Sequence, residues 1–579
     1  MRIGLNSCCP YSFVFSWGAS VSNEIQNTIT SAGIDQMMVD ENSVRRRFMN
    51  RLESTPLEKN MASGEVLGPL QVVGHEGCST HLETSAFYSR FRKGDGIQIR
   101  VALDGASEYL CDQKVRGVSY PSEGRIQIAL GRPRNTPLEV GQEFFIFPAE
   151  SSYMAHRLRQ VVAAHANSLH VKRQPVQLGK PLKSEYSDRL NSSQSEALAH
   201  ILSEKTDSAV QGPPGTGKTQ LLQAIVAQAM HAGLTVGIAA FTNTAVDNAL
   251  SRVADIDILG EFTRVGKKDK VDTARYHAEW IGISRSDSFS KAPISRLYAA
   301  TTHSWVLSDT APQVDLLIVD EAAQVPVYFL GPIRYQGKRI ICLGDHKQLP
   351  PVLKGNHQST VATSEVFSCF TGPEMPMLDT QYRMNATIQE WPSVRFYDGE
   401  LRPDASVQDR DLLSDARGDL GTGPLQLVTH KGGTSCHADP AEASRVADTI
   451  GQLFRKSDLL PAEQIGVISP HRMHNGAIIR ALQAKFGIEV ASRIQVDTVE
   501  RYQGQEREVI LFSFGTTPKN KADTEFLGDA KRLNVAVTRA RSRFYCFASS
   551  RFVAKFPTGQ PDEQTPRGHL ASFFGSFKA

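Results

Sequence analysis

The sequence of 579 residues has no run of about 20 apolar residues, the length that a membrane-spanning helix needs. Its eight cysteines show no C-x-x-C spacing and no paired cysteine and histidine spacing, so we expect reduced thiols and no structural zinc. The formal net charge of +3 is close to neutral, so any binding to a polyanion must come from a local basic surface. No heptad pattern is present, and we expect a monomer.

The amino-terminal residues only loosely resemble a signal peptide, because Asn6, Ser7, Pro10 and Ser12 interrupt the apolar region. We therefore expect an intracellular protein, cytoplasmic or nuclear, without a membrane anchor. The length allows about three to five domains of roughly 100 to 200 residues each. We assign residues 1–62 to a first segment whose role the sequence does not indicate, because they carry no chemical signature.

Residues 63–150 contain short apolar runs separated by glycine turns, which predicts an accessory β-barrel. Basic and aromatic residues punctuate these runs and allow two interpretations. They suit a surface that grips a nucleic-acid backbone and stacks bases, and they equally suit solvent-facing positions that alternate with core aromatics. The residues are Arg90, Arg92, Lys93, Arg100, Lys114 and Arg116, with Phe87, Tyr88 and Phe91.

We expect residues 151–185 to form a helical stalk and a basic linker, because Leu158, Val161 and Val162 define an apolar stripe. A later charge-rich segment, 255–297, also allows two interpretations. It is either a solvated surface excursion or an insertion that touches a bound strand.

The strongest local signal is a glycine-rich loop between a short apolar run at 208–211 and a helical pattern at 221–230. Glycines let backbone N–H groups surround phosphates, and the start of a helix adds partial positive charge. Lys218 would reach the outer phosphates of ATP and Thr219 would hold Mg²⁺. The loop consists of Gly212, Pro213, Pro214, Gly215, Thr216, Gly217, Lys218 and Thr219.

Polar residues follow further apolar runs, as they do where ligands bind at the carboxyl edge of a parallel sheet. After the run at 314–319, Asp320 is suited to bind Mg²⁺ and Glu321 to polarise the attacking water. After the run at 339–343, Gln348 is placed to sense the terminal phosphate. Before the glycine loop, Gln194 is either part of a helix start capped by Asn191 or Ser192, or a reader of the adenine edge.

The second half of the chain repeats the α/β texture without a second phosphate loop. Arginines that reach across an interface stabilise phosphoryl-transfer charge, because a guanidinium group is planar, always charged and bidentate. Arg383, Arg532, Arg539 and Arg541 lie in the polar segments of this half of the chain. We therefore expect an ATP site shared by two lobes.

Taken together, these segments resemble superfamily 1 helicases, in particular the up-frameshift-like branch marked by a DEAA box. The resemblance covers residues 186–552. It rests on residues 190–194 and on the motifs GPPGTGKT, FTNTAVD, ATTHS, VDEAAQ, GDHKQLPP, DTQYRMN, VDTVERYQGQE and LNVAVTRAR.

The resemblance implies two RecA-like lobes, at 186–375 and 376–556, followed by a carboxyl-terminal tail at 557–579. ATP would bind between the lobes and a single strand would cross both, with movement from 5′ to 3′. Around ATP, the implied contacts are Gln194 and Tyr382 on adenine, Glu506 on ribose, Lys218, Arg383 and Arg539 on the γ-phosphate, and Thr219 and Asp320 on Mg²⁺. On the strand, the implied contacts are Asn243, Thr302, Pro470, His471 and Thr498.

The sequence departs from the family pattern at Glu500, Tyr502 and His471, where aspartate, phenylalanine and tyrosine are common. The last of these weakens the expected stacking on the strand, because imidazole offers less π surface. A second function stays open: an ATP-switched nucleic-acid or ribonucleoprotein remodeller that separates no duplex. A signalling ATPase without nucleic acid would leave FTNTAVD and VDTVERYQGQE unexplained. The choice between RNA and DNA depends on 2′-hydroxyl contacts that the sequence does not locate.

Overall fold

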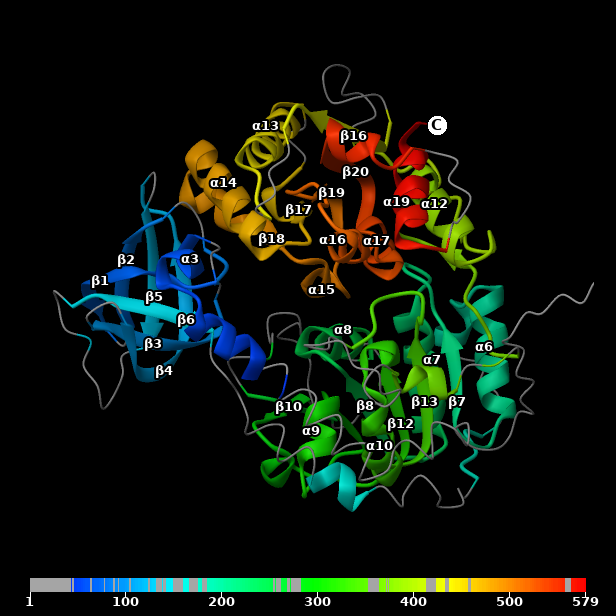
Figure 1. Cartoon of the computed structure of the whole chain (residues 1–579). Coiled ribbons are helices and arrows are strands. Elements are labelled where there is room, and N and C mark those ends of the chain that lie inside the picture. The colour runs from blue at the N-terminus through cyan, green and yellow to red at the C-terminus, as the bar shows by residue number, and fades with distance from the viewer. Residues whose placement is uncertain are drawn as a thin grey trace, which may run out of the picture.

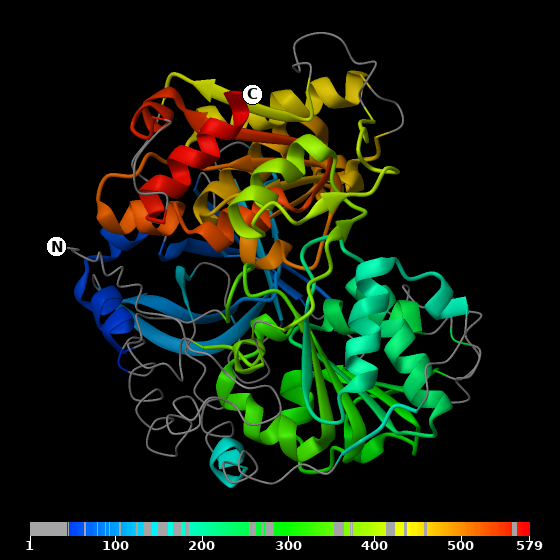
Figure 2. The ribbon, with the colours of Figure 1, turned by 90° about the vertical axis from the view of Figure 1, so that its right-hand side faces the viewer.

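The computed structural model places an antiparallel barrel beside two parallel α/β sheets (Figure 1). Figure 2 gives the same arrangement turned by 90°. The structure describes residues 43, 46–62, 65–77, 79–86, 89–91, 93–103, 106–122, 125–131, 138, 142–148, 160–165, 175–179, 185–253, 256, 262–267, 271, 283–351, 364–370, 372, 374–412, 423–432, 437–456, 460–557 and 564–578. Among these residues, no helix is both long enough and apolar enough to cross a bilayer.

The predicted barrel is confirmed as six antiparallel strands that close in the order β1-β2-β5-β4-β3-β6. Alternate residues point inward, so that Ile126, Ile128 and Leu130 on one strand are all buried in the barrel core. The strands are β1 (Leu67–Glu76), β2 (Ser79–Ser85), β3 (Gly96–Leu103), β4 (Ala106–Ser119), β5 (Arg125–Gly131) and β6 (Phe144–Pro148), and the helix α3 (Leu57–Ala62) precedes them.

Among the described basic and aromatic residues of the barrel, Phe91 and Arg100 make contacts within the protein. Phe91 is buried in the core. Arg100 lies over the Phe147 ring, 4.4 Å from its centroid, and donates to Glu53 at 3.0 Å. Phe87, Tyr88 and Arg92 lie outside the described residues, as does Leu158 of the expected stalk.

The first α/β part is built on a sheet of seven parallel strands in the order β10-β9-β11-β8-β12-β13-β7. Helices cover both of its faces, and two clusters of buried apolar residues fill the two interfaces. The strands are β7 (Ser208–Gln211), β8 (Val236–Ala240), β9 (Phe262–Val265), β10 (Ile283–Ser286), β11 (Leu297–Thr301), β12 (Val314–Asp320) and β13 (Gly337–Gly344). The helices are α5 (Glu185–Asp188), α6 (Ser192–Ser203), α7 (Lys218–His231), α8 (Asn243–Val253), α9 (Thr302–Leu307) and α10 (Leu330–Gln336).

The segment 255–297 is not only a surface excursion, because two of its stretches pair as β9 and β10 within the first sheet. The charged residues of this segment are not typical of strands inside a sheet. Arg264, in the middle of β9, is fully buried and donates through Nε to Asp247 Oδ1 at 2.8 Å. A buried arginine is tolerated when its charge is paired in this way.

The second α/β part has five parallel strands in the order β16-β20-β19-β17-β18. The strands are β16 (Leu425–His430), β17 (Ile465–Ile468), β18 (Gln495–Asp497), β19 (Arg507–Ser513) and β20 (Ala540–Ser549), and a small pair, β14 (Thr380–Gln381) and β15 (Arg402–Pro403), precedes them. The helices are α12 (Ala386–Phe396), α13 (Pro440–Lys456), α14 (Arg472–Arg493), α15 (Val499–Tyr502), α16 (Lys521–Leu527), α17 (Ala530–Val537), α18 (Ser550–Ala554) and α19 (Pro566–Gly575).

The prediction of a carboxyl-terminal tail at 557–579 is wrong for the described residues of that range. Residues 566–575 form α19, and Leu570, Phe573 and Phe574 are buried in the core of the second part. Apolar residues at this spacing fall on one helix face, so burying them stabilises the helix against the sheet.

Candidate functional site

The glycine loop joins the carboxyl end of β7 to the start of α7, as its sequence context predicts. Gly215 and Gly217 have φ angles of 78° and 75°, a region that side chains with a Cβ rarely adopt. A Cβ on Gly212 would lie 2.1 Å from Lys218 Cγ, and one on Gly217 would lie 2.4 Å from Gln194 Nε2. The glycines are therefore required both by the backbone and by the close approach of neighbouring side chains.

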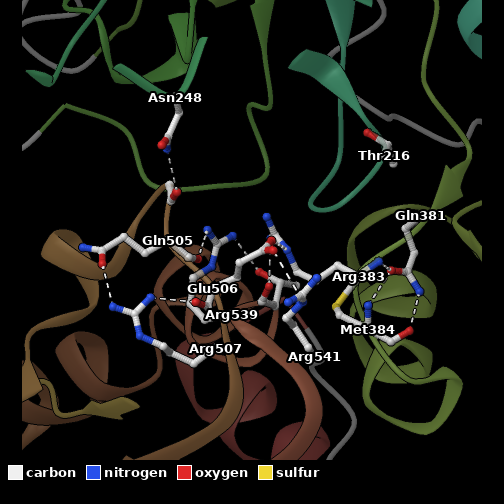
Figure 3. Close-up of polar contacts among 12 residues, drawn as sticks. Thr216, Asn248, Gln381, Arg383, Met384, Gln505, Glu506, Arg507, Arg539 and Arg541 are labelled. Atoms are coloured by element: carbon white, nitrogen blue, oxygen red, sulfur yellow. Dashed lines mark hydrogen bonds and ion pairs between the residues drawn. The ribbon is translucent and has the colours of Figure 1, made fainter. Parts of the chain in front are cut away.

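This loop forms one wall of a cleft of about 700 Å³ that both α/β parts line. The first part contributes Pro213 to Thr219 of the loop together with Asp320, Glu321 and Gln348. The second part contributes Tyr382, Arg383, Glu506, Arg539 and Arg541, several of which point toward one another in Figure 3. The structure thus brings most of the predicted nucleotide contacts into one place.

Lys218 and the carboxylates after β12 form the charged floor of the cleft. Lys218 Nζ lies 3.3 Å from Glu321 Oε1, and both side chains are mostly buried. Burial opposes ionisation of Glu321, but Lys218 and Arg539 outweigh it and lower the pKa of that carboxyl. Burial, aided by the charge of Glu321, raises the pKa of Asp320 to about 7. Glu321 therefore carries the negative charge that polarising a water molecule requires.

The backbone at Glu321 adopts a left-handed conformation, with φ 52° and ψ 40°. Such a conformation at a residue other than glycine costs about 1 to 3 kcal/mol and is concentrated at functional sites. It turns the chain immediately after Asp320, so that two consecutive carboxylates both line the cleft.

Arginines of the second part face this floor. Arg539 is only 2% exposed and donates through Nη1 to the Gln505 backbone oxygen at 3.2 Å. Burial, with the nearby charge of Arg383, lowers the pKa of Arg539 to about 9, so the group stays cationic at neutral pH. Arg383 donates to Glu506 through Nε and to the Thr538 backbone oxygen at 3.0 Å.

Gln348 connects the two parts. Its Nε2 donates to Asp345 Oδ2 at 2.9 Å, and its Oε1 accepts from Arg539 Nη2 at 3.4 Å. Asp345 Oδ2 also accepts from the Tyr397 hydroxyl of the second part at 2.7 Å. Asp345 Oδ1 accepts from Gln211 Nε2, beside the glycine loop, at 3.1 Å. A buried chain of hydrogen bonds therefore runs from the phosphate loop to the second sheet.

The two residues expected near adenine differ in their placement. Gln194 does not line the cleft: its Oε1 accepts from the Asn191 backbone N–H at 3.0 Å and its Nε2 donates to the Thr216 backbone oxygen at 2.9 Å. The predicted helix cap is confirmed, with Asn191 as the capping residue. Tyr382 lines the cleft and is 36% exposed, and its hydroxyl accepts from Asn191 Nδ2 at 2.8 Å.

The residues expected to contact a strand follow the carboxyl ends of strands in both sheets. Asn243 Oδ1 accepts from Arg264 Nη2 at 3.0 Å, and Thr302 is fully buried with its hydroxyl unpartnered. Thr498 occupies the N-cap position of α15 without a capping hydrogen bond from its side chain, and it is 6% exposed. Pro470 is buried, and the His471 ring contacts two other rings.

The donor atoms that line the cleft suit a nucleotide that is bound together with Mg²⁺. Thr219 and Asp320 offer a hydroxyl and a carboxylate, which are oxygen donors of the kind Mg²⁺ prefers. The loop glycines leave a cradle that a Cβ would fill.

Sequence reasoning missed several residues at the site. Arg541 donates through Nη1 to Glu508 at 2.9 Å and lies 3.5 Å from Glu506. Its position two residues after Arg539 at the start of β20 is a signal that could have found it. Asp345 directly follows β13, so it also carried a signal, whereas Tyr397 had none.

Fold and site together define a two-part α/β protein with a phosphate-binding loop. Two family models, both described as AAA domain, match residues 189–413 and 367–551. Neither model covers half of the chain.

Three curated proteins illustrate the similarity. The protein "DNA replication ATP-dependent helicase/nuclease DNA2" of Gallus gallus is 30% identical over 392 residues, which are 64% of this chain and 37% of that protein. Its counterpart of Mus musculus is 31% identical over 409 residues, 64% of this chain and 38% of that protein. "Helicase SEN1" of Saccharomyces cerevisiae is 31% identical over 264 residues, 43% of this chain and 12% of that protein. The chain thus spans well under half the length of each.

A solved arterivirus helicase, nonstructural protein 10, aligns over 85% of this chain and 80% of its own, with 14% identity and a TM-score of 0.39. At that score the similarity does not decide the fold.

Proposed function

We propose that the protein is an ATP-dependent helicase or translocase that moves from 5′ to 3′ along single-stranded RNA or DNA, in the DEAA-box branch of superfamily 1. The observation that supports this most directly is the cleft itself. One wall is a phosphate-binding loop and the opposite wall carries Arg383 and Arg539 from a separate sheet. An ATP site divided in this way makes hydrolysis depend on how the two sheets approach each other. The relatives that are named helicases point in the same direction.

In this proposal the two sheets are RecA-like lobes at 186–375 and 376–556, with the barrel and a stalk at 151–185 as accessory parts. Lys218, Arg383 and Arg539 bind the γ-phosphate of ATP, and Glu321 orients the attacking water. Thr219 and Asp320 hold Mg²⁺, which neutralises phosphate charge when bound. The protein acts inside the cell as a monomer.

Coupling to movement follows from the buried connection between the parts. ATP draws the lobes together, Gln348 senses the γ-phosphate, and Asp345 passes the change to Tyr397 of the second lobe. Asn243, Thr302, Pro470, His471 and Thr498 contact the strand in alternation between the lobes, and Asn243, Thr302 and Thr498 do so through its phosphates. Contacts to phosphate ignore base identity, as a motor requires.

The test is the steady-state ATPase rate, measured alone and with matched single-stranded RNA or DNA at two salt concentrations, because phosphate contacts weaken steeply with salt. We expect stimulation by at least one polymer, and no turnover by Lys218→Ala with either. A duplex-release assay with the same polymer separates the two candidate functions. Stimulation without strand separation identifies a remodeller, and absence of stimulation by both polymers contradicts the motor.

Glu321→Gln tests the chemistry separately. The amide keeps the shape but cannot polarise the water, so kcat should fall by about 10² to 10⁴. ATP binding, measured with a fluorescent analogue, should persist. Turnover at the wild-type rate would show that Glu321 does not serve the reaction.

A further inference from the structure

A series of planar groups lies at the carboxyl edge of the second sheet, and none of its members lines the ATP cleft. The His437 and His471 rings stack with centroids 4.4 Å apart and an interplanar angle of 18°. His471 in turn stacks on Phe526 at 5.2 Å and 28°. The guanidinium of Arg532 lies 4.3 Å from the Phe526 ring centroid. The series therefore runs from an aromatic ring to a cation without interruption.

Neither face of the His471 ring is available to stack on a base. Its ring contacts both neighbours in the series, and its Nε2 is buried without a partner. Burial, with the nearby charges of His437, His474 and Arg532, lowers the pKa of His471 to about 3, so its ring is neutral at physiological pH. A strand base cannot stack on His471 without displacing a protein ring.

His437 occupies the exposed end of the series. Its side chain is exposed, and within the described part of the chain its ring contact is to His471. Its backbone has a φ of 56°, a left-handed conformation that is uncommon for a residue with a side chain and is found at ligand clamps. The protein thus holds an aromatic ring outward at some conformational cost.

Buried contacts hold described residues near His437 in the sequence. Before it, His430 Nε2 lies 2.7 Å from Glu442 Oε2. After it, Asp439 Oδ1 accepts from the Ala441 backbone N–H at 2.9 Å, and the Asp439 N–H donates to His474 Nδ1 at 3.3 Å. All four of these anchoring side chains, His430, Asp439, Glu442 and His474, are buried. Anchoring of the segment that directly follows His437 favours a preformed platform for its ring.

The place of this ring matches the expected path of a strand. His430 ends β16, and Ser469 and Pro470 follow β17 at the same edge of the sheet. The Ser469 backbone N–H donates to the Asp497 oxygen at 3.2 Å, next to Thr498, a proposed phosphate contact. Base stacking on an exposed aromatic ring is sequence-tolerant, because every base has a π face.

We propose that His437 is a base-stacking residue for single-stranded nucleic acid, backed by the series His471, Phe526 and Arg532. This rests on the proposed function and assigns the contact to a base to His437 instead of His471. The ligand is a nucleobase of the strand, not its phosphate.

The test compares His437→Ala and His437→Phe with the wild-type protein in equilibrium binding to fluorescein-labelled 20-nucleotide homopolymers, RNA and DNA. Loss of one stacked base by substitution with alanine weakens binding by about 5- to 150-fold. We expect that loss in His437→Ala and binding within about twofold of wild type in His437→Phe. Basal ATPase without a polymer should be unchanged in both, because His437 does not line the nucleotide cleft.

Tyr335→Ala is the matched control. Tyr335 is also an aromatic residue, 46% exposed, and its ring contacts His165. It lies on α10, directly before the amino-terminal end of β13 and not at a carboxyl edge. The Tyr335→Ala protein should bind both polymers with the affinity of the wild-type protein. An oligomer of abasic residues should bind the wild-type protein and His437→Ala equally.

Two results overturn the inference: unchanged binding by His437→Ala, or a loss in His437→Phe as large as in His437→Ala, which would mean that the residue only supports the fold. These differ from failure of the proposed function, in which the wild-type protein itself binds neither polymer.

Discussion

Arg383 and Glu506 form an ion pair, although the family resemblance assigns one to the γ-phosphate and the other to the ribose of a nucleotide. Arg383 Nε donates to Glu506 Oε2, and Arg541 approaches the other carboxylate oxygen at 3.5 Å (Figure 3). Arg383 and, less strongly, Arg541 lower the pKa of the Glu506 carboxyl against the effect of burial. In this arrangement the Glu506 carboxylate is paired with the Arg383 guanidinium, which is the group proposed to hold the γ-phosphate. ATP would therefore have to separate the pair before both residues contact it.

Glu506→Gln discriminates between two roles of this carboxylate. If Glu506 holds the ribose, loss of a charged hydrogen bond of about 1.5 to 3 kcal/mol should raise KM for ATP by tenfold or more. If Glu506 only pairs with Arg383 and so competes with the γ-phosphate, the substitution should release the guanidinium and lower the KM for ATP. We expect the rise, measured as ATPase activity in the presence of a saturating polymer. The rise should be absent with 2′,3′-dideoxy-ATP, which lacks the ribose hydroxyls, and a lower KM for both nucleotides would contradict the ribose contact.

Tyr397→Phe tests the buried connection through Asp345. The substitution removes the donor at 2.7 Å from Asp345 Oδ2 and the acceptor of Asn534 Nδ2 at 3.1 Å. Burial raises the pKa of the Tyr397 hydroxyl well above its usual value, so the group is a neutral donor. Leaving buried polar groups unsatisfied costs about 1 to 3 kcal/mol. We expect a lower unfolding temperature and a lower kcat with an unchanged KM for ATP.

The control for Tyr397→Phe is Tyr109→Phe on the barrel, where the side chain is 51% exposed. It should change neither quantity. An unfolding temperature and kcat equal to wild type in Tyr397→Phe would mean that the connection carries no coupling.

The parts of the molecule that the sequence predicted are those whose signal is local. The glycine loop needs only a strand before it and a helix after it, and Asp320 and Glu321 directly follow the strand that positions them. Contacts between distant segments gave no such signal. Asp345 and Tyr397 are 52 positions apart and Arg383 and Glu506 are 123 apart, and only folding of both sheets brings each pair together.

Misleading composition explains the other differences. The buried Arg264 makes β9 read as a polar surface segment, because its partner Asp247 lies on α8 rather than nearby in the sequence. In α19, Leu570, Phe573 and Phe574 follow the spacing of an amphipathic helix, so that element had a signal that the tail assignment overlooked.

Phe573→Ala tests whether α19 belongs to the second lobe. Phe573 is 1% exposed and contacts the rings of Trp391, Phe512 and Phe544, which lie on α12, β19 and β20. Truncating a buried phenylalanine costs about 3 to 5 kcal/mol. We expect unfolding by urea at a distinctly lower concentration. Val394→Ala, at a side chain that is 70% exposed, should leave the midpoint unchanged, and an unchanged midpoint in Phe573→Ala would place α19 outside the folded core.

The buried pair of His430 and Glu442 predicts how stability changes with pH. Burial opposes ionisation of Glu442, but hydrogen bonds from His430, His474 and Ser513 lower its pKa from 4.5 to about 2. Its contribution is therefore present above pH 4.5 and is lost as the pH falls from 4.5 toward 2. The hydrogen bond to Glu442 raises the pKa of His430 above 6.5. That contribution is complete below pH 6.5 and is lost as the pH rises through the higher value of the folded state.

The two contributions overlap between pH 4.5 and 6.5, and there Glu442→Gln should be most destabilising relative to wild type. Removing one partner of a buried pair costs about 3 to 5 kcal/mol. The measurement is the urea midpoint of both proteins from pH 3.5 to 8.5. We expect the difference to shrink below pH 4.5, because Glu442 then becomes protonated on unfolding of the wild type, and to shrink again above pH 6.5. A difference that does not vary with pH would show that Glu442 acts through its hydrogen bonds to Ser513 and Gly515 and not through its charge.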